Sequence, residues 1–257
     1  MGKMGVGMAT DCRKITIHTV SFLNKKGSVF YASLPCAGET LKECRTNGED
    51  DRHRLVTILW DHLMAMGNPF WKFYYTPDKE AFPIRVVCNQ LGKPYLLLGE
   101  YQGPAISFSE GGGKVWAALC GDGAEIGIDM AGTYEFKGEY PFHRVFHEQE
   151  LRHALSLTLG DVEQASALLW SVKEAVVKAI GCAFHMVEPR QVYVYPSVSR
   201  EGVYTFPVHL SGKALEHLPV GAGRCIWVYS LPQMEGWFSI AATLKRLCLS
   251  QSTTCNP

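Results

Sequence analysis

The sequence has no charge imbalance and no long hydrophobic run. Its 257 residues contain 25 Lys and Arg against 25 Asp and Glu, which gives a formal net charge of zero. A balanced chain lacks the overall field that draws a protein to nucleic acids or anionic membranes, so we expect neither as a partner. No segment reaches the length of a membrane span, and the first ten residues lack the apolar stretch of a signal peptide. We therefore expect a soluble, cytoplasmic protein that holds any anionic ligand with a local group of cations.

The sequence also lacks the cysteine patterns of disulfide frameworks and zinc sites. It contains nine cysteines, an odd number, and no CxxC pair occurs among them. Several lie inside apolar runs such as Val86-Val87-Cys88, so we interpret them as reduced structural thiols. A zinc site is an alternative, because His143 and His147 are spaced i, i+4 near two glutamates. No third ligand follows at a recognisable spacing, and HExxH is absent.

Strand-like and helix-like segments alternate along the whole chain. Alternating apolar runs predict strands at residues 15–22, 83–88, 95–98, 105–108, 115–120, 125–130, 191–195, 203–210, 224–231 and 237–244. Gly121-Asp122-Gly123, between two of these runs, is typical of a hairpin turn. Helical spacing predicts helices at residues 55–66, 148–157 and 162–180. We expect Asp50 or Asp51 to cap the first of these helices and Gly67 to end it.

This mixture of strands and helices in both halves predicts an α+β fold. Each half is near the ~100-residue scale of a small domain. We predict an N-terminal lobe at residues 13–128 and a C-terminal lobe at residues 129–248. The small, polar or Gly-rich ends, residues 1–12 and 249–257, are predicted to be disordered tails.

The helix predicted at residues 162–180 carries the most informative pattern. Asp161 is a good N-cap, Gln164 stands three residues later as in a capping box, and Gly181 occupies the place of a C′ glycine. Apolar residues cover this helix nearly all round, far beyond the stripe of an ordinary surface helix. We therefore expect it to be buried in the core of the C-terminal lobe.

Past its first turn, this helix has charges only at Lys173, Glu174 and Lys178. Glu174 and Lys178 are spaced i, i+4, so their side chains point the same way. One interpretation is a solvent-exposed ion pair worth ~0.3–0.5 kcal/mol. The other is a carboxylate and an ammonium on the wall of a cleft, where the carboxylate holds a metal or takes a proton. The pattern by itself leaves both open.

Three short motifs resemble the signatures of one enzyme family. Trp170-Ser171-Val172-Lys173-Glu174-Ala175-Val176-Val177-Lys178 is similar to the W-[SCT]-x-K-E-[AS]-x-x-K signature of phosphopantetheinyl transferases. Upstream, Ile126-Gly127-Ile128-Asp129 resembles the family's [IV]-G-[IV]-D motif, and Gly92-Lys93-Pro94 resembles its G-K-P turn. The motifs follow one another in family order, and the resemblance extends roughly over residues 50–244. The chain length is similar to that of the two-lobed, Sfp-type branch rather than the short, trimeric type.

The resemblance implies a fold, an activity and partners. The implied fold is a pair of similar α+β lobes with the active site in the cleft between them. The implied activity is that of a holo-[acyl-carrier-protein] synthase: Mg²⁺-dependent transfer of 4′-phosphopantetheine from coenzyme A to a serine of an apo acyl or peptidyl carrier protein, releasing 3′,5′-ADP. The protein would be a monomer whose partners are coenzyme A and the carrier.

Two acidic residues would hold the metal. A carboxylate at the end of an apolar strand, as at Asp129, is a fixed oxygen ligand suited to Mg²⁺, although Asp also commonly caps turns. By resemblance, Asp129 and Glu174 bind Mg²⁺, and Glu174, directly or through water, takes the proton of the carrier serine. Resemblance further implies that Lys178 stabilises or protonates the departing 3′,5′-ADP and that Lys173 contacts phosphate oxygens.

Basic residues of the first half are candidates for binding coenzyme A. Arg52, His53 and Arg54 fall in the first turn of the predicted helix, where cations oppose the helix dipole unless an anion is bound there. Balance by the acidic residues just before them is an equal alternative. The resemblance implies that Arg54, the best match, and Arg52 contact the 3′-phosphate of coenzyme A. It likewise implies a phosphate contact for Lys93, which is otherwise an ordinary exposed lysine.

Two positions depart from the family pattern. Ser109-Glu110 stands where the family has Ser-His, so Ser109 is a candidate phosphate contact, while Glu110 should repel phosphate unless it binds metal or turns away. Ala131 stands where many members have a third, acidic Mg²⁺ ligand, and water can fill that position. These departures leave a second hypothesis: a catalytically silent module of the same fold that binds coenzyme A or a carrier protein.

Overall fold

The computed structural model describes nine stretches of the chain. They are residues 15–21, 28–36, 41–67, 71, 83–121, 124–138, 140–200, 202–218 and 222–245. Both predicted tails lie outside them. Among the described residues, Cys88 and Cys182 have free thiols. In this part of the chain, no helix combines the length and the hydropathy needed to cross a membrane.

A four-stranded antiparallel sheet and one long helix form the first part of the molecule. The strand order is β1 (His18–Ser21), β2 (Ser28–Pro35), β7 (Lys114–Cys120) and β6 (Ala105–Gly111). Helix α1 (Leu41–Ala65) packs on this sheet through Leu55, Leu59 and Leu63, which are fully buried. A smaller antiparallel sheet contains β3 (Ile84–Cys88), β4 (Pro94–Leu98) and β5 (Tyr101–Gln102).

A six-stranded antiparallel sheet forms the second part. Its main order is β10 (Val198–Arg200), β11 (Val203–Leu210), β12 (Ala222–Gln233), β13 (Gly236–Lys245) and β8 (Ile126–Gly132), and β9 (Val192–Val194) pairs with β11. The helices are α2 (Phe142–Val145), α3 (Glu148–Leu157), α4 (Val162–Ala179) and α5 (Gly212–Glu216), with short 3₁₀ turns η2 (Thr133–Phe136) and η3 (Pro189–Gln191). Helix α4 packs directly on β8 and β13.

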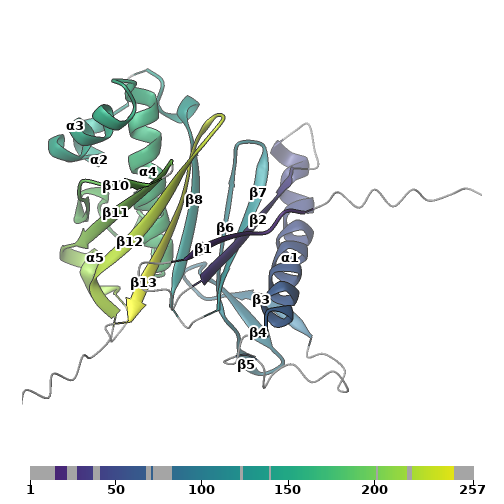
Figure 1. The fold of residues 1–257 in the computed structure, drawn as a ribbon. Coiled ribbons are helices and arrows are strands. Elements are labelled where there is room, and N and C mark those ends of the chain that lie inside the picture. Colours follow the sequence, from purple (N-terminus) through teal and green to yellow (C-terminus); the bar gives the residue numbers. More distant parts are fainter. Residues whose placement is uncertain are drawn as a thin grey trace, which may run out of the picture.

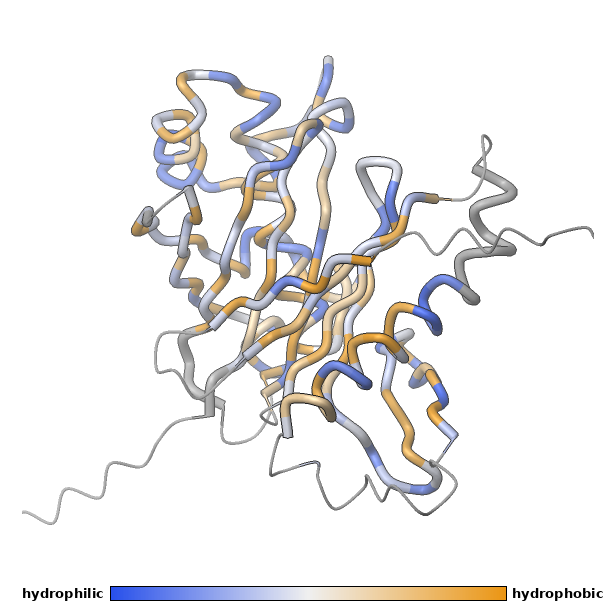
Figure 2. Tube along the Cα trace, turned by 45° about the vertical axis from the view of Figure 1, so that its right-hand side comes forward, coloured by the Kyte–Doolittle hydropathy of each residue, from blue (hydrophilic) through white to orange (hydrophobic). Residues whose placement is uncertain are grey.

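The two main sheets pack against each other between α1 and α4 (Figure 1). Side chains on β7 alternate between the two faces of its sheet: Leu119 joins the core under α1, whereas Trp116 joins the core between the sheets. Trp116 stacks there on Phe238 of β13, with the ring centroids 4.4 Å apart. Hydrophobic residues predominate along the strands in the middle of the molecule (Figure 2). Both faces of each sheet are therefore covered, as in an α+β fold.

The helices of the second part match their predictions closely. Helix α3 occupies the predicted residues, and α4 begins after Asp161, whose side chain accepts the backbone N–H of Gln164 at 2.9 Å. Gly181 follows α4 with φ +78°, a conformation that favours glycine.

Helix α1 begins earlier than predicted. It starts at Leu41, so Asp50 and Asp51 lie inside the helix and do not cap it. No proline interrupts residues 41–54, and several good helix formers occur there, so the helix continues upstream. The predicted helix end is correct, because Gly67 has φ +68° just past Ala65.

The hairpin predicted at Gly121-Asp122-Gly123 is wrong. Strands β7 and β8 belong to different sheets, and β8 pairs antiparallel with β13, with Asp129 opposite Ser239. Long-range pairing of two buried strands overrides the local turn pattern, and the chain crosses here from one sheet to the other. Asp122 and Gly123 themselves lie outside the described residues.

Candidate active site

Strand β8 and helix α4 touch backbone to backbone because Gly127 has no side chain. A Cβ atom at Gly127 would lie 2.0 Å from the carbonyl oxygen of Ala175 and 2.4 Å from the amide nitrogen of Ala179. Any larger residue would push α4 away from the sheet. Asp129 lies two residues further along β8 and therefore on the same face, toward α4. The glycine thus brings Asp129, which lies in the middle of β8 and not at its end as expected, next to the charged residues of α4.

The carboxylate of Asp129 is buried and receives two donors. Lys178 Nζ lies 2.7 Å from Asp129 Oδ1 and also donates to the carbonyl oxygen of Ile128 at 3.1 Å. The hydroxyl of Ser109 donates to the same Oδ1 at 3.1 Å. The resemblance assigned the Ser109 hydroxyl to a coenzyme A phosphate, but this hydroxyl is hydrogen-bonded to Asp129. Ser109 is also not among the residues that line the adjacent cavity described below.

Glu174 is the third charged residue at this place. Its pKa is raised to about 7, first by burial and then by the negative charge of Asp129; the positive charge of Lys178 opposes this rise, and Glu135 adds to it. The carboxylates of Glu174 and Asp129 are therefore close enough to repel each other. A carboxyl group with a pKa near neutrality is suited to taking up and releasing a proton at physiological pH.

Two neighbours of this cluster were not anticipated. Glu135, in η2, accepts the backbone N–H of Gly132 at 2.7 Å, and burial and the charge of Asp129 raise its pKa. The pKa of Tyr140 is raised to about 12 by burial and by the charges of Glu135 and Glu174. Neither residue belongs to a recognisable motif. The only available signal was the position of Glu135 a few residues after the end of β8.

The donor set fits a hard divalent cation. The carboxylates of Asp129, which is buried, and Glu174, which is partly buried, repel each other and would be stabilised by a cation between them, and oxygen is the ligand that Mg²⁺ prefers. Among the described residues, no group of three or more His, Cys, Asp and Glu side chains could hold a metal. Asp129 and Glu174 would therefore supply two oxygens, with water and phosphate completing the shell, as is common for Mg²⁺. Ala131 adds no ligand, and the zinc alternative at His143 and His147 gains no support.

A cavity of about 590 Å³ lies beside this cluster, between the first part of the chain and the end of α4. Its lining includes residues of α1, of the β3–β4 region, of β6 and of α4 with the segment that follows it: Arg52, His53, Lys93, Phe108, Lys178 and Cys182. In the described part of the chain, the charged residues of this lining are all basic. The cavity therefore offers positive charge to an anionic ligand.

Lys93 is a basic residue of the cavity lining with two partners. Its Nζ pairs with Glu125 Oε2 at 2.5 Å and donates to the carbonyl oxygen of Ala179 at 3.2 Å. A cation at the last carbonyl groups of a helix also interacts favourably with the helix dipole. Lys93 thus ties the β3–β4 turn to the C-terminal end of α4, while it remains part of the cavity lining.

Arg52 is the positively charged residue by which α1 contributes to the cavity lining. Its Nη2 pairs with Glu110 Oε1 at 2.8 Å, and its guanidinium lies over the ring of Phe108, 5.6 Å from the centroid. The Nε atom of Arg52 is buried without a hydrogen-bond partner. Glu110 thus turns toward Arg52 and does not line the cavity.

Arg54, the preferred match from the resemblance, is exposed and does not line the cavity, whereas Arg52 and His53 do. Leu55 and Leu59 fix the rotation of α1 by packing on the sheet. Successive helical residues are turned by ~100°, so residues two apart face different sides of the helix.

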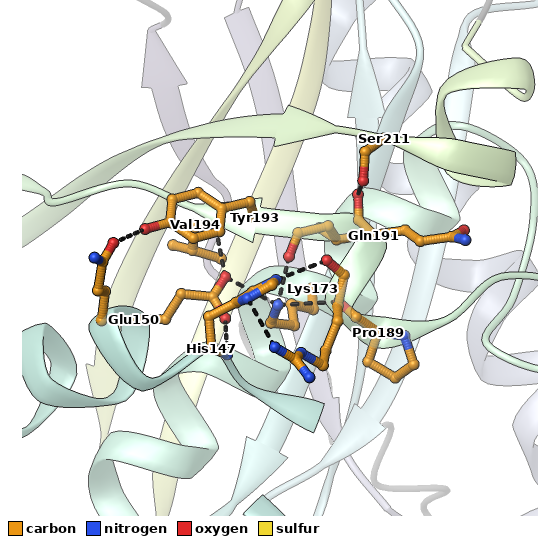
Figure 3. A network of polar contacts seen from close by, with 11 residues as sticks. His147, Glu150, Lys173, Pro189, Gln191, Tyr193, Val194 and Ser211 are labelled. Atoms are coloured by element: carbon orange, nitrogen blue, oxygen red, sulfur yellow. Dashed lines mark hydrogen bonds and ion pairs between the residues drawn. The ribbon is translucent and has the colours of Figure 1, made fainter. Parts of the chain in front are cut away.

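Lys173 lies elsewhere. It is fully buried, and its Nζ donates to Glu150 Oε1 at 3.0 Å, to the carbonyl oxygen of Pro189 at 3.0 Å and to that of Val192 (Figure 3). An ammonium has three protons, so none remains for a ligand. The phosphate contact implied for Lys173 is therefore replaced by a structural role, which joins α4 to α3 and to the segment before β9.

Part of the chain that includes this cluster matches the model of a known protein family. Residues 125–214 match the model of the 4′-phosphopantetheinyl transferase superfamily. The match runs from just before β8 into α5 and includes Asp129, Glu174 and Lys178, but not the cavity residues of the first part. No curated protein matches the chain. Phosphopantetheine transfer is the chemistry that this match supports, in a family that generally uses coenzyme A and Mg²⁺ and acts on carrier proteins.

Proposed function

We propose that this chain transfers the 4′-phosphopantetheine group of coenzyme A to a serine hydroxyl of an apo acyl or peptidyl carrier protein and releases 3′,5′-ADP. One observation carries the proposal. Asp129, Glu174 and Lys178 meet inside the region that matches the family model, next to a cavity whose charged lining is basic. We further propose that the enzyme acts as a monomer.

The proposed architecture is a pair of similar α+β lobes. Each part of the chain packs one long helix, α1 or α4, on an antiparallel sheet, which supports this proposal. The division would fall between β7 and β8, where the chain changes sheets. Coenzyme A would occupy the cavity between the lobes, with its pyrophosphate near Asp129 and its 3′-phosphate near Arg52 and Lys93.

Asp129 and Glu174 would hold the metal ion of the reaction. When bound, Mg²⁺ would supply the positive charge that neutralises the pyrophosphate and its leaving oxygen. The repulsion between the two carboxylates makes this place favourable for a cation, and the basic residues of the cavity would bind the remaining phosphate charge.

Glu174 is the proposed general base. The carrier serine oxygen forms a bond to the phosphorus that bears the pantetheine arm, and its proton passes to Glu174, directly or through water. The bond from that phosphorus to the bridging oxygen breaks, and 3′,5′-ADP leaves with the electron pair. Lys178 would stabilise or protonate the leaving phosphate, a role that its position in the cavity lining and its pairing with Asp129 support.

Mass spectrometry of an apo carrier protein tests the proposal. Incubation with coenzyme A and Mg²⁺ should add about 340 Da, the mass of one phosphopantetheine group transferred in this chemistry. Asp129→Ala and Glu174→Gln should abolish the addition while circular dichroism shows an intact fold. If a panel of apo carriers stays unmodified while the protein binds coenzyme A in solution, the silent binding module is the correct function.

A further inference from the structure

The gap between the two main sheets is closed by serine side chains. Strand β6 is the last strand of the first sheet and β8 the last of the second, and no backbone ladder pairs them. The N–H groups of Ile128 and Met130 instead donate to Ser107 Oγ and Ser109 Oγ, each at 3.0 Å. Both serines are buried, so these side chains replace the missing ladder.

Ser109 makes a second contact. Its hydroxyl has a single proton, and that proton goes to Asp129 Oδ1 at 3.1 Å. Lys178 Nζ approaches the same oxygen at 2.7 Å. Among the described residues, no hydrogen bond or ion pair reaches Asp129 Oδ2. The carboxylate is therefore held at one oxygen from two sides, and its other oxygen remains available.

We propose that Ser109 is a positioning residue for Asp129, an inference that rests on the proposed function. Ser109 fixes the rotation of the carboxylate, so that Oδ1 stays with Lys178 and Oδ2 would be available to a bound Mg²⁺. The side chain of Lys178 is 31% exposed and long, so it alone would let the carboxylate turn. Ser109 is anchored by the Met130 N–H of the neighbouring strand and holds its place.

Ser107 supplies a matched comparison within the same seam. Each serine accepts one buried backbone N–H of β8 at the same distance, but only Ser109 also donates to Asp129. Ser109→Ala and Ser107→Ala should therefore lower the melting temperature by similar amounts. Only Ser109→Ala should change the response to Mg²⁺.

The experiment titrates Mg²⁺ against wild type and variants at saturating coenzyme A, with two readouts: the thermal shift of the protein and the initial rate of carrier modification. In both, Ser109→Ala should raise the half-saturating Mg²⁺ concentration about tenfold, the lower end of what loss of an outer-shell partner causes. Ser107→Ala should stay within about twofold of wild type on this scale. Ser109→Thr, which keeps the hydroxyl, should recover most of the loss.

The proposal is overturned if Ser109→Ala stays within twofold of wild type, or if Ser107→Ala shifts the Mg²⁺ response equally. If Ser109→Ala does not fold, Ser109→Cys is measured in its place, because a thiol of similar shape is a weak donor. A wild-type protein that neither modifies carriers nor responds to Mg²⁺ refutes the proposed function itself. That result is distinct from failure of the Ser109 comparison in an active enzyme.

Discussion

The buried pair of Lys173 and Glu150 gives the sharpest prediction about stability. Both side chains are fully buried, and Glu150 also accepts the backbone N–H groups of His147 at 2.7 Å and Val194 at 2.6 Å (Figure 3). Lys173→Met would leave a buried carboxylate without its cation and two carbonyl oxygens without their donor. Removing one partner of such a pair costs about 3–5 kcal/mol. That is a large share of the roughly 5–15 kcal/mol that stabilises an ordinary protein.

An exposed ion pair on α3, the helix that also carries Glu150, is the control. Arg152 and Glu148 approach to 2.6 Å, closer than Lys173 and Glu150, but their side chains are 70% and 87% exposed. Arg152→Ala should cost less than about 0.5 kcal/mol, because water screens an exposed i, i+4 pair. Urea unfolding of the two variants measures both free energies. A Lys173→Met variant within 1 kcal/mol of wild type, or an equal loss in Arg152→Ala, would refute the reasoning.

Further predictions concern the candidate site. Glu174→Gln should stabilise the metal-free protein by up to about 3 kcal/mol above pH 7 but not below pH 4.5. The carboxyl pKa is raised from 4.5 to about 7 in the folded protein, so the wild type loses stability as pH rises through this range. Melting curves recorded in the presence of a chelator test this. Gly127→Ala should cost at least about 1–3 kcal/mol in urea unfolding and lower the transfer rate. Glu110→Gln should lower the KM for coenzyme A several-fold by freeing Arg52, and an unchanged or higher KM contradicts this. Lys178→Ala should reduce kcat with little change in KM.

The sequence predicted well where local and long-range signals agree. Helix α4 has a cap, a stop glycine and an apolar surface that all indicate the same element, and its boundaries were correct within a residue. The motifs also led us to expect Asp129 and Glu174 close together, and the charge of Asp129 raises the pKa of Glu174. The pairing of Lys178 with Asp129 was not expected. Gly127 gives the physical reason for this proximity, since the contact it permits fixes β8 against α4.

The failures concern what each side chain touches. Lys173 and Lys178 are both lysines of one motif, and spacing alone does not reveal that Lys173 points to Glu150 while Lys178 points to Asp129. Ser109 was a candidate phosphate contact because of its place in the resemblance. The hydrogen bond that it makes to Asp129 depends instead on how two separate sheets meet. Such contacts join residues far apart in the chain, and the periodicity of a single sequence predicts only local structure, so it does not predict them.

The family match covers α4 and the strands β8 to β11, whereas β12, β13 and the first part of the chain lie outside it, although the first part supplies much of the cavity. The two regions are constrained differently. At β8 and α4 the backbones touch, so few residues are compatible with the arrangement. Around Arg52 the proposed function requires only net positive charge toward the cavity, which many side-chain arrangements can supply. Glu110 illustrates this freedom, since it stands where the family that the sequence resembles has histidine, pairs with Arg52 and does not itself line the cavity. Substitution can therefore accumulate in the first part without loss of a cationic pocket, whereas the Asp129 cluster depends on fixed backbone geometry.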